Sequence, residues 1–365
     1  MIRRTRIRTA VGASAALAGL ALAGCTSAAP QPDSSGSADA PGVLVAAVAG
    51  GTYGEALAAT QLVPFEEATG IEVQLVEGGS NHNAEIQAQV ASGNVQWDLV
   101  GCTPDEVTSL PDIYEPIDYS IVTATDDLVD GDSAKERYVL HDFEAFPLLA
   151  YNSEVTSAAP SGWADFFDVQ GIPGQRGVPD LGIKSAWALP VAALIADGVA
   201  PDELFPLDLD RAYALLEELK PSLTFYAEYA QGQDLLQSGD VAMAVLTDGR
   251  ALQLKNGGAP VDVVWKGAVA NHACIAIPKG APNAENAMRF IQWYLENPQS
   301  QADFTATTTY GPATNAGVEA ATAAGIEDFT SLHVDELVPQ SDEMLAYVAE
   351  HSQELLDRWN AFSQG

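Results

Sequence analysis

The sequence predicts an α/β fold with about two lobes, in which mainly parallel sheets are covered by helices. The first observation is a repeated order of strand, glycine-rich turn, helix and strand between residues 43 and 100, which is typical of parallel βαβ units. The second is length, because at about 150 residues per domain the part of the 365-residue chain after Cys25 suggests roughly two domains. The third is a hydrophobic content of 47%, which indicates a packed core.

The first part of the predicted folded body follows this order closely. Leu57, Leu62 and Phe65 fall near one face of a predicted helix over 55–68, and Gly70 is a typical stop signal for it. A further helix precedes the third strand and also ends at a glycine. Apolar residues run together or alternate with polar ones in three short segments, which predicts strands at 43–48, 71–75 and 97–100.

The pattern returns in the second half of the chain. Ala212, Leu215, Leu216 and Leu219 form a helical stripe that ends before Pro221. The middle of the chain, from 118 to 182, is richer in Pro, Gly and Asp and is less regular. The chain contains no visible internal repeat. Buried strands are predicted at 241–246 and 274–277, and a helix face at Phe290, Ile291, Tyr294 and Leu295.

Acidic residues far outnumber basic ones. The 50 Asp and Glu residues face 16 Lys and Arg residues, which gives a net charge of −34. Because phosphate backbones are bound by clustered Lys and Arg, this balance argues against a nucleic-acid partner. A soluble or halophile-like acidic surface is the expected main cause of the charge, and the acidic string at 126–132 is interpreted as a solvated loop.

The first 25 residues have the organisation of an export signal. Four arginines precede an uncharged, Ala- and Leu-rich run over 10–24, which is shorter than the roughly 18 apolar residues that span a bilayer. An ordinary signal peptide cut elsewhere is the alternative to a lipoprotein signal. The run ends in a sequence that resembles a bacterial lipobox, in which the cysteine is acylated, namely Leu22, Ala23, Gly24 and Cys25.

These features predict a protein held at a membrane by a lipid. Residues 1–24 are interpreted as a lipoprotein signal peptide, and 25–42 as a lipidated flexible tether, because the latter is rich in Ala, Pro, Ser and Gly. No later stretch is apolar and long enough to span a membrane. The expected location is therefore the extracytoplasmic face of the cell membrane, with a lipid anchor at Cys25.

Each of the three predicted strands in the first part is followed by a polar loop that contains glycine. Ligands of parallel α/β sheets bind outside the carboxyl ends of the strands, and the helices that follow present unpaired N–H groups. The loops therefore favour a polar small-molecule site, although tight turns without ligand contact are an alternative. The candidate ligand-binding residues in these loops are Gly51, Tyr53, Ser80, Asn81 and Thr103.

No catalytic or metal motif is present in the folded part of the sequence. It contains no Gly-x-Ser-x-Gly elbow, no phosphate loop and no His-Glu-x-x-His pair, and the five histidines are dispersed. We therefore predict a protein that is not an enzyme and that uses no cofactor or metal. An exported α/β hydrolase is a remote alternative.

Cys102 and Cys274 are the two cysteines outside the lipobox, and both stand at the ends of predicted strands. In an oxidising compartment, a disulfide between them is one interpretation, and two separately buried thiols are the other.

Several segments, in order along the chain, resemble one known family. The resemblance extends from Val43 to Asn360, and its closest branch is the spermidine/putrescine-binding proteins. The family is the bacterial extracellular solute-binding proteins of ABC importers, with the type II fold of periplasmic binding proteins. The segments that carry the likeness are Phe65–Val73, Gln87–Val90, Gly93–Asp98, Trp163–Asp168, Ala276–Asn283, Ala287–Ile291 and Tyr310–Pro312.

The resemblance implies a two-lobed receptor without enzymatic activity. Its lobes would be mixed, mainly parallel sheets flanked by helices and joined by strands that cross between them, and they would close on a solute by a hinge movement. The closed form would dock, as a monomer, on a permease in the membrane. The expected first lobe is 43–138 with 273–308, and the second is 139–272 with 309–365.

The resemblance also implies a small amine as ligand, with a polyamine such as putrescine or spermidine as the main expectation. Amine ligands are held by carboxylates and aromatic faces. Arg250 and Lys184 favour the alternative of a zwitterionic or anionic organic solute. Aromatic and acidic residues of the branch are matched here by Asn271, His272 and Ala273, and Pro190 replaces a glutamate. The site residues that this comparison adds are Tyr151, Trp187, Thr247, Asp248, Arg250, His272 and Tyr310.

Overall fold

The computed structural model describes residues 42–365 except 79–81 and 131–132. The predicted signal peptide, Cys25, the tether up to residue 41, Ser80 and Asn81 lie outside the described residues. The structure confirms the α/β class and contains two mixed sheets, one of six strands and one of five. Within the described part of the chain, no helix has the length and apolar character needed to cross a membrane.

The six-stranded sheet contains the strands predicted from the first part of the sequence. Its first strand pairs in parallel with the next two along the chain, while its fifth strand along the chain runs antiparallel to two neighbours. In spatial order the strands are β11 (Gly311–Pro312), β4 (Tyr138–Phe143), β10 (Ala273–Ala276), β3 (Leu99–Cys102), β1 (Val43–Ala49) and β2 (Glu72–Gly78).

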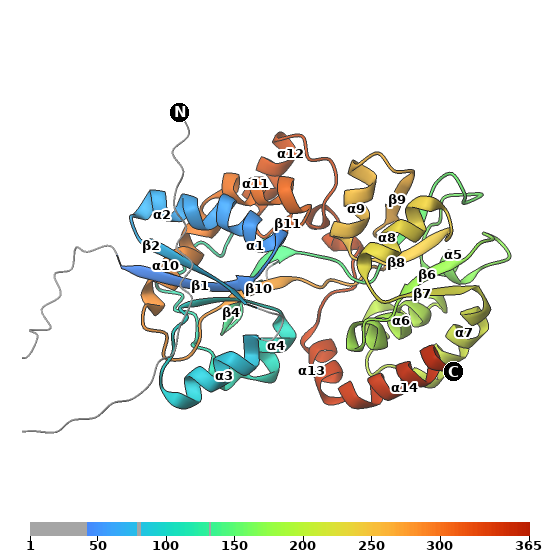
Figure 1. Ribbon diagram of the computed structural model, residues 1–365, viewed down its shortest axis with the longest axis horizontal. Helices are drawn as coiled ribbons and strands as arrows, with labels where there is room; N and C mark the ends of the chain where they lie inside the picture. Colours follow the sequence, from blue (N-terminus) through green and yellow to red (C-terminus); the bar gives the residue numbers. More distant parts are fainter. Residues whose placement is uncertain (1–41, 79–81, 131–132) are drawn as a thin grey trace, which may run out of the picture. The chain divides into compact units, whose positions relative to one another are not determined.

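Helices pack on both faces of this sheet (Figure 1). The predicted helix over 55–68 is confirmed as a continuous run through a π-helical turn, and it ends at Gly70 in the left-handed conformation, at φ 73°. Phe65 is fully buried against Phe290 and Trp293. The helices of this part are α1 (Thr52–Leu57), α2 (Val63–Thr69), α3 (His82–Ser92), α4 (Pro104–Ser109), α10 (Ala284–Leu295), α11 (Pro298–Thr308) and α12 (Asn315–Ala323).

The five-stranded sheet takes two strands from the less regular segment 118–182 and three from the later part of the chain, including the strand predicted at 241–246. Its parallel pairs lie at one end, and antiparallel pairs flank its fourth strand in space. In spatial order the strands are β7 (Leu223–Tyr226), β6 (Arg176–Pro179), β8 (Met243–Leu246), β5 (Leu148–Asn152) and β9 (Val261–Val264).

Two groups of helices cover this second sheet, with α8 and α9 on one face and α6, α7 and α14 on the other (Figure 1). Its core contains the fully buried Trp163 and Trp359 from segments far apart in sequence. The helices are α5 (Trp163–Phe167), α6 (Ile183–Ala196), α7 (Leu209–Leu219), α8 (Tyr229–Ser238), α9 (Asp248–Asn256), α13 (Asp342–Glu350) and α14 (Ser352–Gln364).

Three segments connect the two sheets: 144–147 between β4 and β5, 265–272 between β9 and β10, and 324–341 between α12 and α13. They are hydrogen-bonded to one another. The N–H of Asn271 donates to the carbonyl of Glu144 at 2.9 Å, and the N–H of Ala270 donates to the carbonyl of Val338 at 2.9 Å. The connections therefore form a small bonded unit, which we call the hinge strands.

A disulfide joins β3 to β10 within the first sheet. Cys102 and Cys274 stand opposite each other in the antiparallel register, with a Cα–Cα distance of 4.9 Å. The structure therefore confirms the predicted disulfide, and the alternative of two separately buried thiols is wrong.

Candidate functional site

A cavity with a volume of ≈ 570 Å³ lies between the two sheets, beside the hinge strands. Its walls come from loops at the carboxyl ends of β1 and β3, from the hinge strands, and from α6 and α13 on the other side. Its lining residues include Ala49, Tyr53, Cys102, Thr103, Asp105, Glu106, Glu144, Ile183, Lys184, Trp187, Asn271, Ala273, Gln340, Met344, Leu345 and Val348.

The first wall is made by the polar loops that the sequence singles out. Because β1 and β3 are parallel neighbours, their carboxyl ends meet at one edge of the sheet. Gly51 precedes α1, and Tyr53 in its first turn lines the cavity. Thr103 precedes α4, and its N–H donates to the Glu106 carboxylate at 2.9 Å, which anchors that helix start.

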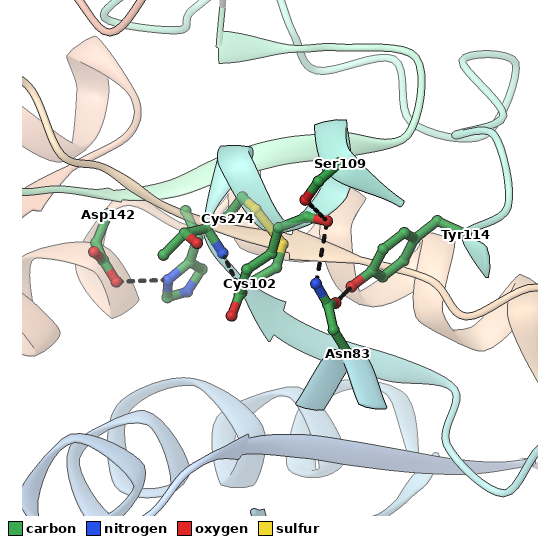
Figure 2. The surroundings of a disulfide bond; sticks show 9 residues. Asn83, Cys102, Ser109, Tyr114, Asp142 and Cys274 are labelled. Carbon is green, nitrogen blue, oxygen red and sulfur yellow. Dashed lines mark hydrogen bonds and ion pairs between the residues drawn. A yellow bond between two sulfur atoms is a disulfide. The ribbon is translucent and has the colours of Figure 1, made fainter. Parts of the chain in front are cut away.

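The disulfide lies in the same wall, and Figure 2 shows its surroundings. Cys102 lines the cavity directly before Thr103. On one side of the disulfide is Asp142, and on the other is the side chain of Asn83, which donates from Nδ2 to the carbonyl of Glu106 at 3.2 Å. The start of α4 is therefore fixed both by a covalent bond next to it and by a hydrogen bond from α3.

Acidic groups gather where β4 passes into the hinge strands. Asp142 is 1% exposed, and its Oδ2 accepts a hydrogen bond from the Tyr53 hydroxyl at 2.7 Å and hydrogen-bonds His141 Nδ1 at 3.0 Å. Glu144, two residues further on, is half-buried and lines the cavity. Asp248, at the start of α9, is fully buried and accepts a hydrogen bond from the Thr330 hydroxyl.

The pKa values of Glu144 and Asp248 are both raised. Burial, followed by the charges of Asp142 and Asp248, raises the pKa of Glu144 well above its usual range, and Lys184 partly opposes this shift. Burial likewise raises the pKa of Asp248 to about 7, although the hydrogen bond from Thr330 acts in the opposite direction. Within the described residues, none of the three carboxyl groups forms a salt bridge with Lys or Arg.

A positive charge stands on the opposite wall. Among the described residues that line the cavity, Lys184 is the one Lys or Arg. It is the second residue of α6 and is exposed. Since its charge lowers the pKa of Glu144, the two side chains are close enough to act on each other electrostatically.

The rest of that wall is apolar. Trp187 of α6 is 6% exposed, and Met344 and Leu345 of α13 are 2% and 3% exposed. All three line the cavity together with Ile183 and Val348. The cavity therefore offers separate acidic, basic and apolar surfaces, which is the arrangement expected for a small ligand with charged ends and an aliphatic middle.

Some predicted site residues lie just behind the cavity lining. The Tyr310 ring is 6.2 Å from that of Tyr53, and the charge of Glu144, followed by burial, raises the pKa of the Tyr310 hydroxyl well above its usual value. A Cβ at Gly249 would lie 2.7 Å from Tyr310 Cε1, so only glycine permits this close approach. Thr247 precedes α9. Tyr53, Thr103 and Trp187 are the predicted residues in the lining itself.

The structure places three other predicted residues elsewhere. Tyr151 stands opposite Asp262 in the second sheet, and Arg250 is exposed on α9. His272 lines a second cavity of ≈ 470 Å³, and its ring lies 4.1 Å from that of Phe143. Burial lowers the pKa of His272 to about 4.

The position of His272 follows from the alternation of side chains along an extended strand. Asn271 and Ala273 line the first cavity, whereas Ala270 and His272 line the second. Likewise, Glu144 lines the first cavity and Phe143 lines the second. The hinge strands therefore form a thin wall between two cavities, and adjacent residues face opposite sides of it.

The sequence analysis missed Asp142 and Glu144 as site residues. They lie in the segment 118–182, which has weak strand and helix patterns. The available signal was short: two acids spaced two residues apart at the end of an apolar strand, Tyr138–Phe143. In an extended backbone that spacing places both side chains on one face, although it does not indicate which face meets a cavity.

Comparisons with known proteins identify the family of the chain. Residues 60–329 match a family model described as bacterial extracellular solute-binding protein. A gamma-aminobutyric acid-binding protein of Pseudomonas aeruginosa is 30% identical over 314 residues, which cover 82% of this chain and 85% of that protein. A spermidine/putrescine-binding periplasmic protein of Escherichia coli is 28% identical over 92 residues, about a quarter of either chain.

Solved structures show the same fold. A GABA receptor is similar with a TM-score of 0.74 and 30% identity, and the match covers 87% of this chain and 97% of that one. An ABC transporter substrate-binding protein of Bradyrhizobium japonicum has a TM-score of 0.75 and 28% identity, with 88% and 99% covered. The protein therefore belongs to the bacterial extracellular solute-binding proteins, as a non-enzymatic receptor that captures a small molecule for an ABC importer.

Proposed function

We propose that the protein captures a short zwitterionic amine, of the kind represented by GABA, and delivers it to an ABC permease. The observation that carries this proposal is the placement of Glu144 and Lys184, a carboxyl group and a lysine on opposite walls of one cavity. A zwitterion would satisfy both groups at once, because its ammonium pairs with the carboxylate and its carboxylate pairs with the lysine. This favours the alternative ligand class of the sequence analysis over the polyamine.

The ammonium end would be held at Glu144. The neighbouring carboxyl groups of Asp142 and Asp248 add negative potential at that point, and neither has a Lys or Arg partner among the described residues. The rings of Tyr53 and Tyr310 lie beside this cluster, and an aromatic face attracts a cation. Thr103 is proposed as a polar contact on the same side.

The carboxylate end would be held at Lys184, with the Asn271 amide as a further donor. The aliphatic middle would lie against Trp187, Met344 and Leu345, since apolar contact without hydrogen-bonding groups suits methylene carbons. Closure of the two lobes about the hinge strands would bring the two ends of the ligand into contact with both walls.

A polyamine is the second candidate, and two observations favour it. Acidic side chains outnumber basic ones in the cavity lining, where Asp105, Glu106 and Glu144 face Lys184. The short match to the spermidine/putrescine-binding protein adds to this. One observation argues against a polyamine. Lys184 would repel its second ammonium group, and other contacts would have to offset that repulsion.

The test compares ligands of one length that differ only in their end groups: GABA, putrescine, butylamine and butyrate. Binding to the folded state raises stability by RT ln(1 + [L]/Kd), about 2.7 kcal/mol at a hundredfold excess over Kd, so thermal shift and calorimetry both report it. We expect GABA to bind at least about tenfold more tightly than either singly charged analogue. Tighter binding of putrescine than of GABA would establish the polyamine candidate instead.

We also propose the lobe division and the anchor. The lobes are 43–138 with 273–308 and 139–272 with 309–365, and the pairing of β4 and β11 in the six-stranded sheet favours moving the first boundary to Glu144 and including β11 in the first lobe. Residues 1–24 would be the signal peptide, with a lipid on Cys25, a tether up to residue 42, and action as a monomer. Metabolic labelling with palmitate tests the anchor: the wild type takes up label and Cys25→Ser does not.

A further inference from the structure

A stacked pair of rings connects two of the three hinge strands. Trp265 directly follows β9 and begins one hinge strand, and His333 lies in another, between α12 and α13. The two rings are 4.4 Å apart, with an angle of 10° between their planes. The backbones of the same strands are also paired, because the N–H of Gly267 donates to the carbonyl of Glu336 at 3.0 Å. The ring pair therefore lies where the hinge strands leave the second sheet.

Both ring nitrogens of His333 contact carboxylate oxygens. Nε2 lies 2.9 Å from Asp328 Oδ1, and Nδ1 lies 2.8 Å from Glu336 Oε1. An ionised carboxylate only accepts hydrogen bonds, and a neutral imidazole carries one N–H group. Both contacts are therefore hydrogen bonds only when the ring is an imidazolium. Without the second proton, a lone pair of the ring would face a carboxylate oxygen at the same short distance.

The same carboxylates connect His333 to the rest of the second sheet and its helices. Asp328 Oδ1 also accepts a hydrogen bond from the indole Nε1 of Trp265 at 3.1 Å, and its Oδ2 accepts one from Lys255 Nζ on α9 at 2.8 Å. Lys255 in turn lies 2.8 Å from Asp262 on β9. The cluster thus joins two hinge strands to one helix and one strand.

The charge of the cluster depends on His333. An imidazolium gives two cations, His333 and Lys255, against the three carboxylates of Asp262, Asp328 and Glu336. A neutral ring leaves Lys255 alone against all three. Other titratable groups beside the cluster are Tyr151 on β5, which stands opposite Asp262, and the exposed chain neighbours Lys266 and Asp335.

The electrostatic surroundings favour the charged ring. Burial lowers the pKa of His333, but the hydrogen bonds and charges of Asp328 and Glu336 outweigh burial and raise this pKa above its usual 6.5. Burial also acts against ionisation of Asp328, yet the hydrogen bonds from His333 and Lys255 hold its pKa below the usual value. Asp328 is therefore ionised over the whole range in which His333 titrates.

We propose that His333 is a proton-dependent clamp of the hinge: the charged ring holds two hinge strands to the second sheet, and loss of its proton lets them move more freely. The contribution of this clamp to stability is fully present below pH 6.5 and is lost as the pH rises through the raised pKa of His333. The identity of the solute plays no part in the clamp, so its failure would leave the proposed function standing.

The first experiment follows the proton itself. In the full chain with labelled histidines, the ring signal of His333 is the one that is absent from His333→Gln, and NMR gives its titration midpoint. We expect a midpoint above 6.5, and a lower one in Glu336→Gln, which removes one of the two carboxylates at an exposed position. A wild-type midpoint at or below 6.5, or an unchanged midpoint in Glu336→Gln, would contradict the clamp.

The second experiment follows the hinge, by hydrogen exchange of the wild type and His333→Gln. At a pH below 6.5, the amides of 265–272 and 324–341 should exchange at least about tenfold faster in the variant, because a hydrogen bond to a charged group is lost. Above the measured midpoint the two proteins should exchange alike. Comparison at equal pH cancels the intrinsic pH dependence of exchange.

The matched control is His351→Gln. The ring of His351 is also stacked, on Tyr347 at 4.4 Å, but it contacts a single carboxylate, Glu354 at 3.2 Å, and lies after α13. Exchange of the two hinge segments should be that of the wild type in this variant. If His333→Gln accelerates exchange equally at both pH values, the ring acts by packing alone and the proton-dependent clamp is wrong. Equal exchange in His333→Gln and the wild type at the lower pH would also overturn it.

Discussion

Arg176 is fully buried in β6 and forms no salt bridge within the part of the chain that the structure describes. Its guanidinium donates to the carbonyls of Phe166, Gly174 and Ile172, at 2.8, 2.8 and 2.6 Å. These hydrogen bonds therefore connect the end of α5 and the turn after it to the second sheet. A guanidinium suits this position because its fork of N–H groups can satisfy several acceptors at once.

Replacing Arg176 by Met should destabilise the fold by about 3 kcal/mol, because the carbonyls would remain buried without donors. Denaturant unfolding measures this change. The control is Arg211→Met, which removes an exposed pair with Asp197 and should cost less than about 1 kcal/mol. Equal effects of the two substitutions would show that the buried contacts do not stabilise the fold.

At the same scale, Glu144→Gln should weaken GABA binding by at least about tenfold, because it removes the charged partner of the ammonium. Lys184→Met should weaken GABA and strengthen putrescine, because the lysine attracts a carboxylate and repels an ammonium. Calorimetry measures both affinities. The proposed assignment of the two ligand ends is incorrect if Lys184→Met changes the affinity for both ligands by the same factor.

Asp248 should make stability depend on pH. Its pKa in the folded protein is raised to about 7 from 3.8, so the folded state binds more protons than the unfolded state between these values. The contribution of Asp248 to the free energy of unfolding is present below about pH 4 and is lost as the pH rises through about 7. Because the low pKa of His272 acts in the opposite direction, the measurement is the difference between the melting curves of the wild type and Asp248→Asn. We expect Asn to gain relative stability as the pH rises, and a constant difference would contradict this.

At the scale of elements, the disulfide stabilises the wall of the cavity between β3 and β10. It links residues 172 positions apart, and removal of such a link typically costs about 2–5 kcal/mol. The double variant Cys102→Ser and Cys274→Ser should therefore melt at a lower temperature. Adding a reductant should lower the melting temperature of the wild type and leave that of the double variant unchanged.

The elements differ in how far the sequence could predict them. The helix that ends at Gly70 and the strands beside it were predictable, because their apolar patterns and stop signal are local. β4 was not, since its strand character depends on pairing with β10, which lies more than a hundred residues later. The sequence also did not predict which cavity each residue of the hinge strands faces. A shift of the strand pairing by one residue would place His272, in place of Asn271, in the first cavity. The pairing register therefore decides which of the two lines it.

At the scale of the whole folded body, contacts already extend across the opening of the cavity. α4 from the first sheet's side packs against α13 from the second sheet's side, and Lys135 lies 3.7 Å from Asp342 at the start of α13. The hinge strands also join these two sides. A solute that contacts both walls therefore adds to contacts that favour the closed arrangement.

Saturation with ligand should then shift the small-angle scattering of the protein to a smaller radius of gyration. The expected change is absent in Glu144→Gln at the same ligand concentration, because that variant binds weakly. Scattering curves that stay superimposable for the wild type, at a ligand concentration where calorimetry shows full occupancy, would rule out closure on binding.

The thin wall between the two cavities has a practical consequence for sensor design. A solute bound on one side contacts strands whose other side carries His272 and Phe143, so we expect a label on that far side to report occupancy. An environment-sensitive dye attached at the exposed position of Asp335, on the rim of that far side, would brighten or dim with uptake without competing for the binding surface.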